Sequence, residues 1–115
     1  MPARQHALRA YRALALGATL CLALVSASAG AGTVEVRIEQ YTYVPASVTV
    51  RVGDTVRWMN TEKRTSHSIL FTGPGGFESE RLFGGETFER RFDRPGRYAY
   101  TCGPHPEMRG VVVVE

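Results

Sequence analysis

Apolar and polar residues alternate with a period of two after residue 32. The apolar positions of the first two repeats are Val34, Val36, Ile38, Val48, Val50 and Val52. Such alternation predicts half-buried β-strands, whereas a proline cannot donate to a strand ladder. We therefore expect strands near residues 33–39 and 47–52, separated by a break over Tyr41–Ala46 that contains Pro45.

The rest of the chain reads as further short strands between turns. Gly53-Asp54 and Asp93-Arg94-Pro95-Gly96 are turn sequences, and a polar loop spans Asn60–Ser66. The apolar positions between these turns are Val56, Trp58, Ile69, Leu70, Phe71, Phe88, Phe92, Tyr98 and Tyr100. Val111–Val114 is apolar on both faces, which predicts a central strand. With no stretch of helical period, the sequence predicts an all-β fold, an antiparallel or mixed β-sandwich of seven to eight strands.

Arg90 conflicts with this pattern, because it has the same parity as Phe88 and Phe92 and should point inward. A long arginine side chain can lay its stem on apolar residues while its head group stays in water. We expect Arg90 to lie at the rim of the sandwich in this way.

Residues 1–29 have the pattern of a secretory signal peptide. Three arginines precede the apolar run Leu14–Val25, and small residues at Ala27–Ala29 suit a cleavage site. A second acceptable cleavage frame ends at Ala31. The apolar run is shorter than the ~20 residues of a membrane span, so we expect no stable membrane insertion. The interpretation is a secreted, periplasmic domain of residues 30–115.

Removal of the expected signal peptide lowers the net positive charge of the chain. The whole chain has 14 basic and 11 acidic residues, and residues 1–29 hold three arginines and no acidic residue, which leaves the mature domain near neutral. No basic stripe interleaved with aromatics remains, so we expect no nucleic-acid partner. Gly73-Pro74-Gly75-Gly76 lacks the Gly-Lys-Ser/Thr that a phosphate-binding loop requires and is interpreted as a flexible turn.

Cys102 is the one cysteine of the mature domain, so no disulfide can form within it. Secreted domains of this size usually need a disulfide or a metal for stability. An unpaired thiol in an oxidising compartment is a liability unless it is occupied. A bound metal satisfies both requirements.

The loop Tyr100–Met108 supplies the chemistry for such a metal. It places Cys102, His105 and Met108 at three-residue spacing, and His67 upstream would complete four ligands. Thiolate and imidazoles with a weak methionine ligand are typical of a type 1, or blue, copper electron-transfer site. Pro104 and Pro106 restrict the loop backbone, which suits a site that must keep its shape in two redox states.

Three other functions compete with this interpretation. A hydrolase with Cys102 as nucleophile lacks a visible oxyanion-hole motif, and the domain is small for an enzyme. Structural zinc would give Met108 no role. A copper carrier or storage module without electron transfer is the remaining alternative, although two strand-anchored loops favour a rigid redox site over one that releases its metal.

The same residues resemble a known family. The loop C-x-x-H-x-x-M with its prolines, and the segment from Tyr43 to Asn60, are similar to the cupredoxins, most of all to amicyanins and also to plastocyanins and pseudoazurins. The resemblance implies a Greek-key sandwich with one copper per chain, in which His67, Cys102 and His105 are equatorial ligands and Met108 is axial. It also implies a monomer that exchanges electrons with a redox donor and acceptor, such as a cytochrome c or a periplasmic dehydrogenase.

Two departures from the family bear on the site. An Asn after the first histidine often bonds to a Ser or Thr after the cysteine, whereas this chain has Ser68 and Gly103. Because Gly103 has no side chain to bond with, we expect the two ligand loops to be less firmly connected. Glu107 adds a charge beside His105, which favours a cationic partner and puts an amine dehydrogenase in doubt.

Overall fold

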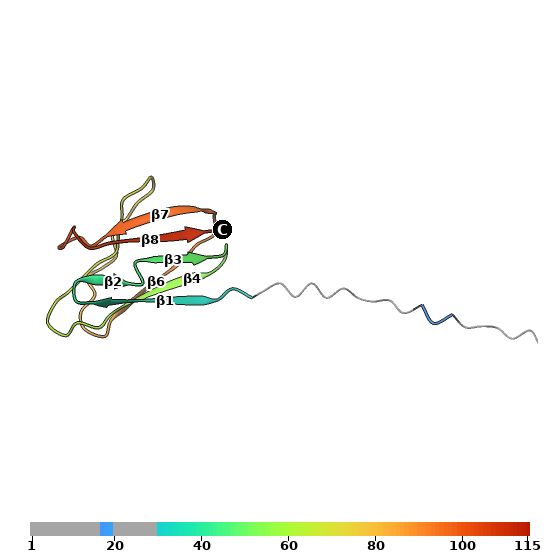
Figure 1. Ribbon diagram of the computed structural model, residues 1–115, viewed down its shortest axis with the longest axis horizontal. Helices are drawn as coiled ribbons and strands as arrows, with labels where there is room; N and C mark the ends of the chain where they lie inside the picture. The colour runs from blue at the N-terminus through green and yellow to red at the C-terminus, as the bar shows by residue number, and fades with distance from the viewer. Residues whose placement is uncertain (1–16, 20–29) are drawn as a thin grey trace, which may run out of the picture.

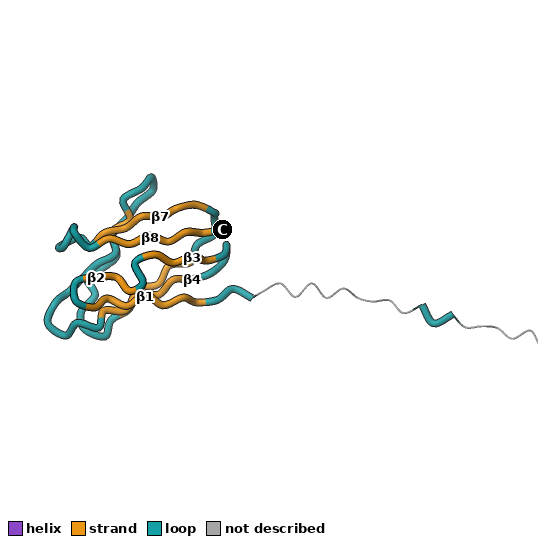
Figure 2. Tube along the Cα trace, in the orientation of Figure 1, coloured by secondary structure: helices purple, strands orange, loops and turns teal. Residues whose placement is uncertain are grey.

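Eight strands form two four-stranded sheets in the computed structural model, which describes residues 17–19 and 30–115 (Figure 1). The expected signal peptide lies outside the described residues apart from positions 17–19. The described part of the chain contains no helix, and so none that could cross a membrane (Figure 2). The all-β prediction is confirmed.

The first sheet has the strand order β2-β1-β4-β6. Its strands are β1 (Thr33–Glu39), β2 (Thr42–Val44), β4 (Thr55–Asn60) and β6 (Thr87–Arg91). β1 pairs parallel with β4, and the other pairs are antiparallel. The N-terminal strand of the domain is therefore an interior strand of this sheet.

The second sheet has the order β3-β8-β7-β5. Its strands are β3 (Ser47–Val50), β5 (Leu70–Phe71), β7 (Gly96–Thr101) and β8 (Arg109–Val114). β8 pairs parallel with β3 and antiparallel with β7, which confirms the central position that its apolar faces predict. One parallel pair in each sheet makes this a mixed sandwich.

The core lies between the inward faces of the two sheets and centres on Trp58, which is fully buried. Its indole ring meets Tyr100 and Phe71 edge-on, at centroid distances of 5.4 and 5.9 Å. The other buried apolar residues are Val36, Ile38, Tyr43, Val48, Val50, Val56, Ile69, Leu82, Phe92, Cys102, Met108, Val112 and Val114. Two prospective metal ligands thus belong to the core itself.

The break expected over Tyr41–Ala46 is only partly correct. β2 lies within this segment and pairs with β1 through a two-residue hairpin turn, with Glu39 opposite Thr42. Gln40 and Tyr41 occupy the turn at φ values of +49° and +58°, the left-handed conformation of a type I′ hairpin. Such turns usually contain Gly or Asn, so the sequence carries no signal for this one. Pro45 and Ala46 do separate two strands, because the chain passes there from β2 in the first sheet to the strand Ser47–Val50 in the second.

Two other expectations need correction. β3 ends at Val50, and Val52 is 46% exposed because the chain turns at Gly53, where φ is +94°. Arg90 is half-buried, and its head group is not simply in water. Its guanidinium carbon lies 4.3 Å from the ring centre of Phe71 and 4.7 Å from that of Phe92, so cation–π contact replaces much of its hydration. Burial lowers the pKa of Arg90 accordingly.

Candidate metal centre

Three ligand atoms converge at one end of the sandwich. His67 lies in the β4–β5 connection, and Cys102 and His105 lie in the loop between β7 and β8, at the end opposite the C-terminus (Figure 1). The Cys102 Sγ lies 3.7 Å from Nδ1 of each histidine, and the two Nδ1 atoms are 3.2 Å apart. The structure therefore brings together three of the four predicted ligands.

This triangle has the dimensions of a trigonal metal site. A first-row metal about 2.0 Å from each nitrogen and about 2.3 Å from the sulfur would hold them about 3.5 and 3.7 Å apart. The observed separations are 3.2 and 3.7 Å. Two imidazoles and one thiolate in a plane form the donor set of a blue-copper centre, so the residues fit a copper ion.

The fourth predicted ligand, Met108, is buried at the base of the same loop with 2% of its surface exposed. Its backbone N–H donates to the His105 carbonyl at 2.9 Å, and its carbonyl accepts from the Cys102 N–H at 3.2 Å. These bonds fold the loop back on itself and keep the three residues together. His67 and Cys102 are fully buried, whereas His105 is partly exposed, so His105 is the solvent-facing member of the triangle.

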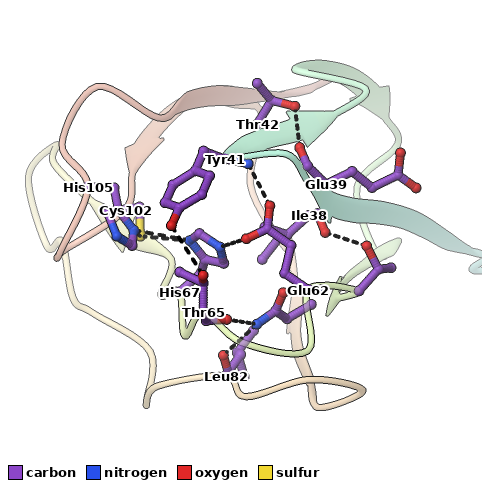
Figure 3. A network of polar contacts seen from close by, with 12 residues as sticks. Ile38, Glu39, Tyr41, Thr42, Glu62, Thr65, His67, Leu82, Cys102 and His105 are labelled. Carbon is purple, nitrogen blue, oxygen red and sulfur yellow. Dashed lines mark hydrogen bonds and ion pairs between the residues drawn. The ribbon is translucent and has the colours of Figure 1, made fainter.

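Glu62 orients His67. Its Oε2 accepts from the His67 Nε2 at 2.5 Å, which leaves Nδ1 free for a metal (Figure 3). Its Oε1 accepts from the Tyr41 backbone N–H at 2.6 Å. Burial opposes the charge on Glu62, but these hydrogen bonds outweigh it and hold the Glu62 pKa below its usual range. The sequence analysis missed Glu62, and the polar loop around it offered no signal.

Tyr41 covers the two histidines from the side of the β1–β2 hairpin (Figure 3). Its ring lies edge-on to His105 at 4.9 Å and to His67 at 5.4 Å, and its hydroxyl is 3.2 Å from Thr65 Oγ1. The left-handed backbone at Tyr41 aims the ring at the site. Strain in this conformation costs about 1–3 kcal/mol, which the contacts with Glu62 and the histidines help to offset.

The segment before His67 is fixed by Asn60, the fully buried last residue of β4. Its side-chain amide donates to the carbonyls of Thr65 at 2.7 Å and Leu82 at 2.8 Å. His67 and Leu82 exchange two backbone hydrogen bonds, at 3.1 and 2.7 Å. Hydrogen bonds within the protein therefore hold His67 from both sides.

The two ligand loops are connected through Ser68 and Gly103, although Gly103 has no side chain. The Gly103 backbone N–H donates to Ser68 Oγ at 2.9 Å, and the Ser68 backbone N–H donates to Cys102 Sγ at 3.4 Å. The backbone of Gly103 replaces the missing side chain, because the short serine lets it approach closely. The connection depends on a different pair of groups from the usual one, but it is present.

Tyr43 supports Ser68 from below. Its buried hydroxyl donates to the Ser68 carbonyl at 2.6 Å. Burial, together with the nearby Cys102 thiol, raises the Tyr43 pKa well above its usual range, so the phenol remains a neutral donor. In the sequence, Tyr43 lies in the expected break and begins the segment that resembles the cupredoxins, but neither feature gave it a role at the site.

The comparisons with known proteins agree with this geometry. The family model described as copper binding proteins of the plastocyanin/azurin family matches residues 31–115. Amicyanin-alpha of Methylorubrum extorquens is 39% identical over 113 residues, which cover 95% of this chain and 93% of that protein. Plastocyanin of Scenedesmus fuscus is 34% identical over 85 residues, 64% of this chain and 86% of that protein.

A solved structure shows the same arrangement of strands. The structure of a reduced amicyanin carrying a single substitution superposes with a TM-score of 0.69 at 34% identity. The superposition covers 73% of this chain and 83% of the amicyanin chain. Fold, donor set and relatives thus point to the same kind of metal centre.

Proposed function

Because the chain belongs to the plastocyanin/azurin family of copper-binding proteins, we propose that it is a small periplasmic type 1 copper protein that carries single electrons between redox partners. The triangle of Cys102 Sγ and the two histidine Nδ1 atoms is the observation that carries this proposal. His67, Cys102 and His105 would hold the copper ion through two imidazoles and a thiolate, and Met108 would be its weak fourth ligand. Copper in such a site supplies one-electron chemistry by alternating between Cu(II) and Cu(I).

The protein's part is to keep the ligands in one arrangement for both oxidation states. Asn60, Glu62 and the backbone of Leu82 fix His67, while the bonds among Cys102, His105 and Met108 fix the other loop. Since little has to move when the charge changes, an electron can pass without a large rearrangement. A carrier that releases copper would need the opposite property, so this network favours electron transfer over the alternative of copper carriage or storage.

His105 is the proposed point of contact with partners, because it alone of the three converging residues is partly exposed. Apolar surface lies beside it at Tyr41, which is 47% exposed. Phe83, the residue after Leu82, is also exposed, at 58%. Glu107 adds a carboxylate on the same loop. A monomer docking this end against a cationic redox protein, such as a cytochrome c, fits these features. The secretory pattern of residues 1–29 supports a periplasmic location.

A visible absorption spectrum tests the function. Purified mature protein with added Cu(II) should show an intense blue thiolate-to-copper band that bleaches with ascorbate and returns on oxidation. Cys102→Ser should abolish the band. A colourless protein that binds only Cu(I) would contradict electron transfer and favour the carrier function instead.

A further inference from the structure

Glu78 reaches the metal centre from a third loop, between β5 and β6. Its Oε1 accepts a 2.7 Å hydrogen bond from the Ser68 hydroxyl. The same hydroxyl oxygen accepts the Gly103 N–H, so Ser68 links the loops of His67, Glu78 and Cys102. A hydroxyl can donate once and still accept, and here both capacities are used.

The absence of a side chain at Gly103 leaves room for the Glu78 carboxylate. A Cβ at position 103 would overlap Glu78 Oε1 and would lie 2.9 Å from Ser68 Oγ and 3.0 Å from Glu78 Cδ. The carboxylate of Glu78 therefore occupies the space that a side chain after the cysteine would need. The arrangement depends on all three residues: Gly103 leaves room for the Glu78 carboxylate, and the Ser68 hydroxyl bonds to both.

Glu78 also brings a negative charge that no cation neutralises. Among residues 30–115 it forms no ion pair, and every ion pair there involves a different carboxylate. A copper–thiolate unit is one positive charge richer as Cu(II) than as Cu(I). A nearby carboxylate therefore stabilises the oxidised form more than the reduced form. Because Glu78 is exposed, solvent and salt weaken the effect without removing it.

We propose that Glu78 is a positioning and tuning residue of the metal centre: it closes the Ser68–Gly103 connection between the ligand loops and favours Cu(II) over Cu(I). The tuning half rests on the proposed function. The positioning half does not, because both hydrogen bonds of the Ser68 hydroxyl join protein groups alone.

The tuning is tested with Glu78→Gln, which retains an acceptor for Ser68 but removes the charge. Glu80→Gln is the matched control, since Glu80 is exposed, lies two residues away and makes no side-chain hydrogen bond or ion pair within the described part of the chain. In an electrochemical titration, Glu78→Gln should lower the Cu(II)/Cu(I) ratio at fixed applied potential about three- to tenfold, tenfold being 59 mV for one electron. The control should change the ratio less than twofold. Equal effects of the two variants would overturn the tuning.

The positioning is tested in metal-free protein by amide hydrogen exchange at Gly103. Glu78→Ala removes the acceptor that orients the Ser68 hydroxyl, so Gly103 exchange should accelerate at least fivefold, whereas Glu78→Gln should leave it nearly unchanged. Unchanged exchange in Glu78→Ala would overturn the positioning. This readout stands even if the protein proves to be no electron carrier, and absence of the blue band in the unmodified protein would count against the proposed function alone.

Discussion

The hydroxyl of Tyr43 and the carbonyl of Ser68 form a short hydrogen bond, 2.6 Å long, between a core side chain and a ligand loop. Tyr43→Phe removes the donor and leaves a buried carbonyl without a partner. We expect the free energy of unfolding to fall by about 1–3 kcal/mol, measured by urea denaturation of the metal-free protein.

Tyr98→Phe is a suitable comparison, because the Tyr98 hydroxyl donates to an exposed carbonyl, that of Arg94, at 2.8 Å. Water can replace the lost donor there, so the change in unfolding free energy should be smaller, below about 1 kcal/mol. Losses of equal size in both variants would show that the Tyr43 bond gives the ligand loop no special support.

The sequence points to the proposed ligands to different degrees. Cys102, His105 and Met108 lie within seven residues of one another, so their spacing on one loop made them candidates. Glu78 could not be found in this way, because it lies between β5 and β6 and only the folded chain brings it to Ser68. Glu62 is five residues before His67 in the same loop, but the sequence does not show that its carboxylate meets the imidazole. Their carboxylates look like ordinary surface charges in the sequence.

At the scale of strands, Gly110 allows β7 and β8 to meet closely. It lies opposite Tyr100, and an added Cβ would overlap the Tyr100 ring, with Cε2 at 2.6 Å. Tyr100 cannot move away, because it is buried against Trp58, and its burial raises the Tyr100 pKa to about 12. Gly110→Ala should therefore lower the free energy of unfolding by about 1–3 kcal/mol through overpacking.

Thermal or urea unfolding checks this expectation against Gly73→Ala. A Cβ added at Gly73 would have no neighbour within 4 Å, and the backbone there is not left-handed, so its replacement should change stability by less than about 0.5 kcal/mol. A Gly110→Ala protein as stable as the Gly73→Ala protein would mean that the strand pair can relax around the methyl group.

The strands themselves followed from the period-two pattern wherever one face is buried, as in β1, β3 and β4, whereas the apolar run Val111–Val114 predicted β8. The pattern failed at β2, whose left-handed turn at Gln40 and Tyr41 contains neither Gly nor Asn. For Arg90, alternation correctly indicated the inward face but not the aromatic rings that contact its head group there. Both misses come from tertiary contacts that outweigh local preference.

At the scale of the whole molecule, Asp54 connects the two sheets at the end away from the metal centre. Its carboxylate accepts from the Gly32 N–H at 2.9 Å, just before β1, and from the Arg51 N–H at 2.8 Å, just after β3. These hydrogen bonds hold the Asp54 pKa below its usual range. The native state therefore keeps the carboxylate ionised at pH values where the unfolded chain takes up a proton.

The contribution of Asp54 to the free energy of unfolding is present above about pH 4, the ordinary aspartate range. It is lost as pH falls towards the lower native pKa. Asp54→Asn should be less stable than the unmodified protein at about pH 5, and the two curves of unfolding free energy should converge as pH falls below the ordinary aspartate range. Asp93→Asn alters only an exposed ion pair with Arg91. Its curve of unfolding free energy against pH should stay nearly parallel to that of the unmodified protein. Parallel curves for Asp54→Asn would rule out this role.

The central position of β8 also sets when the molecule can form during its synthesis. β8 follows every other described strand in the chain, yet β3 has no other partner in its sheet, and about sixty residues separate the two. Cys102, His105 and Met108 are made just before β8. A nascent chain therefore completes neither this sheet nor the group of candidate ligands until β8 has been synthesised.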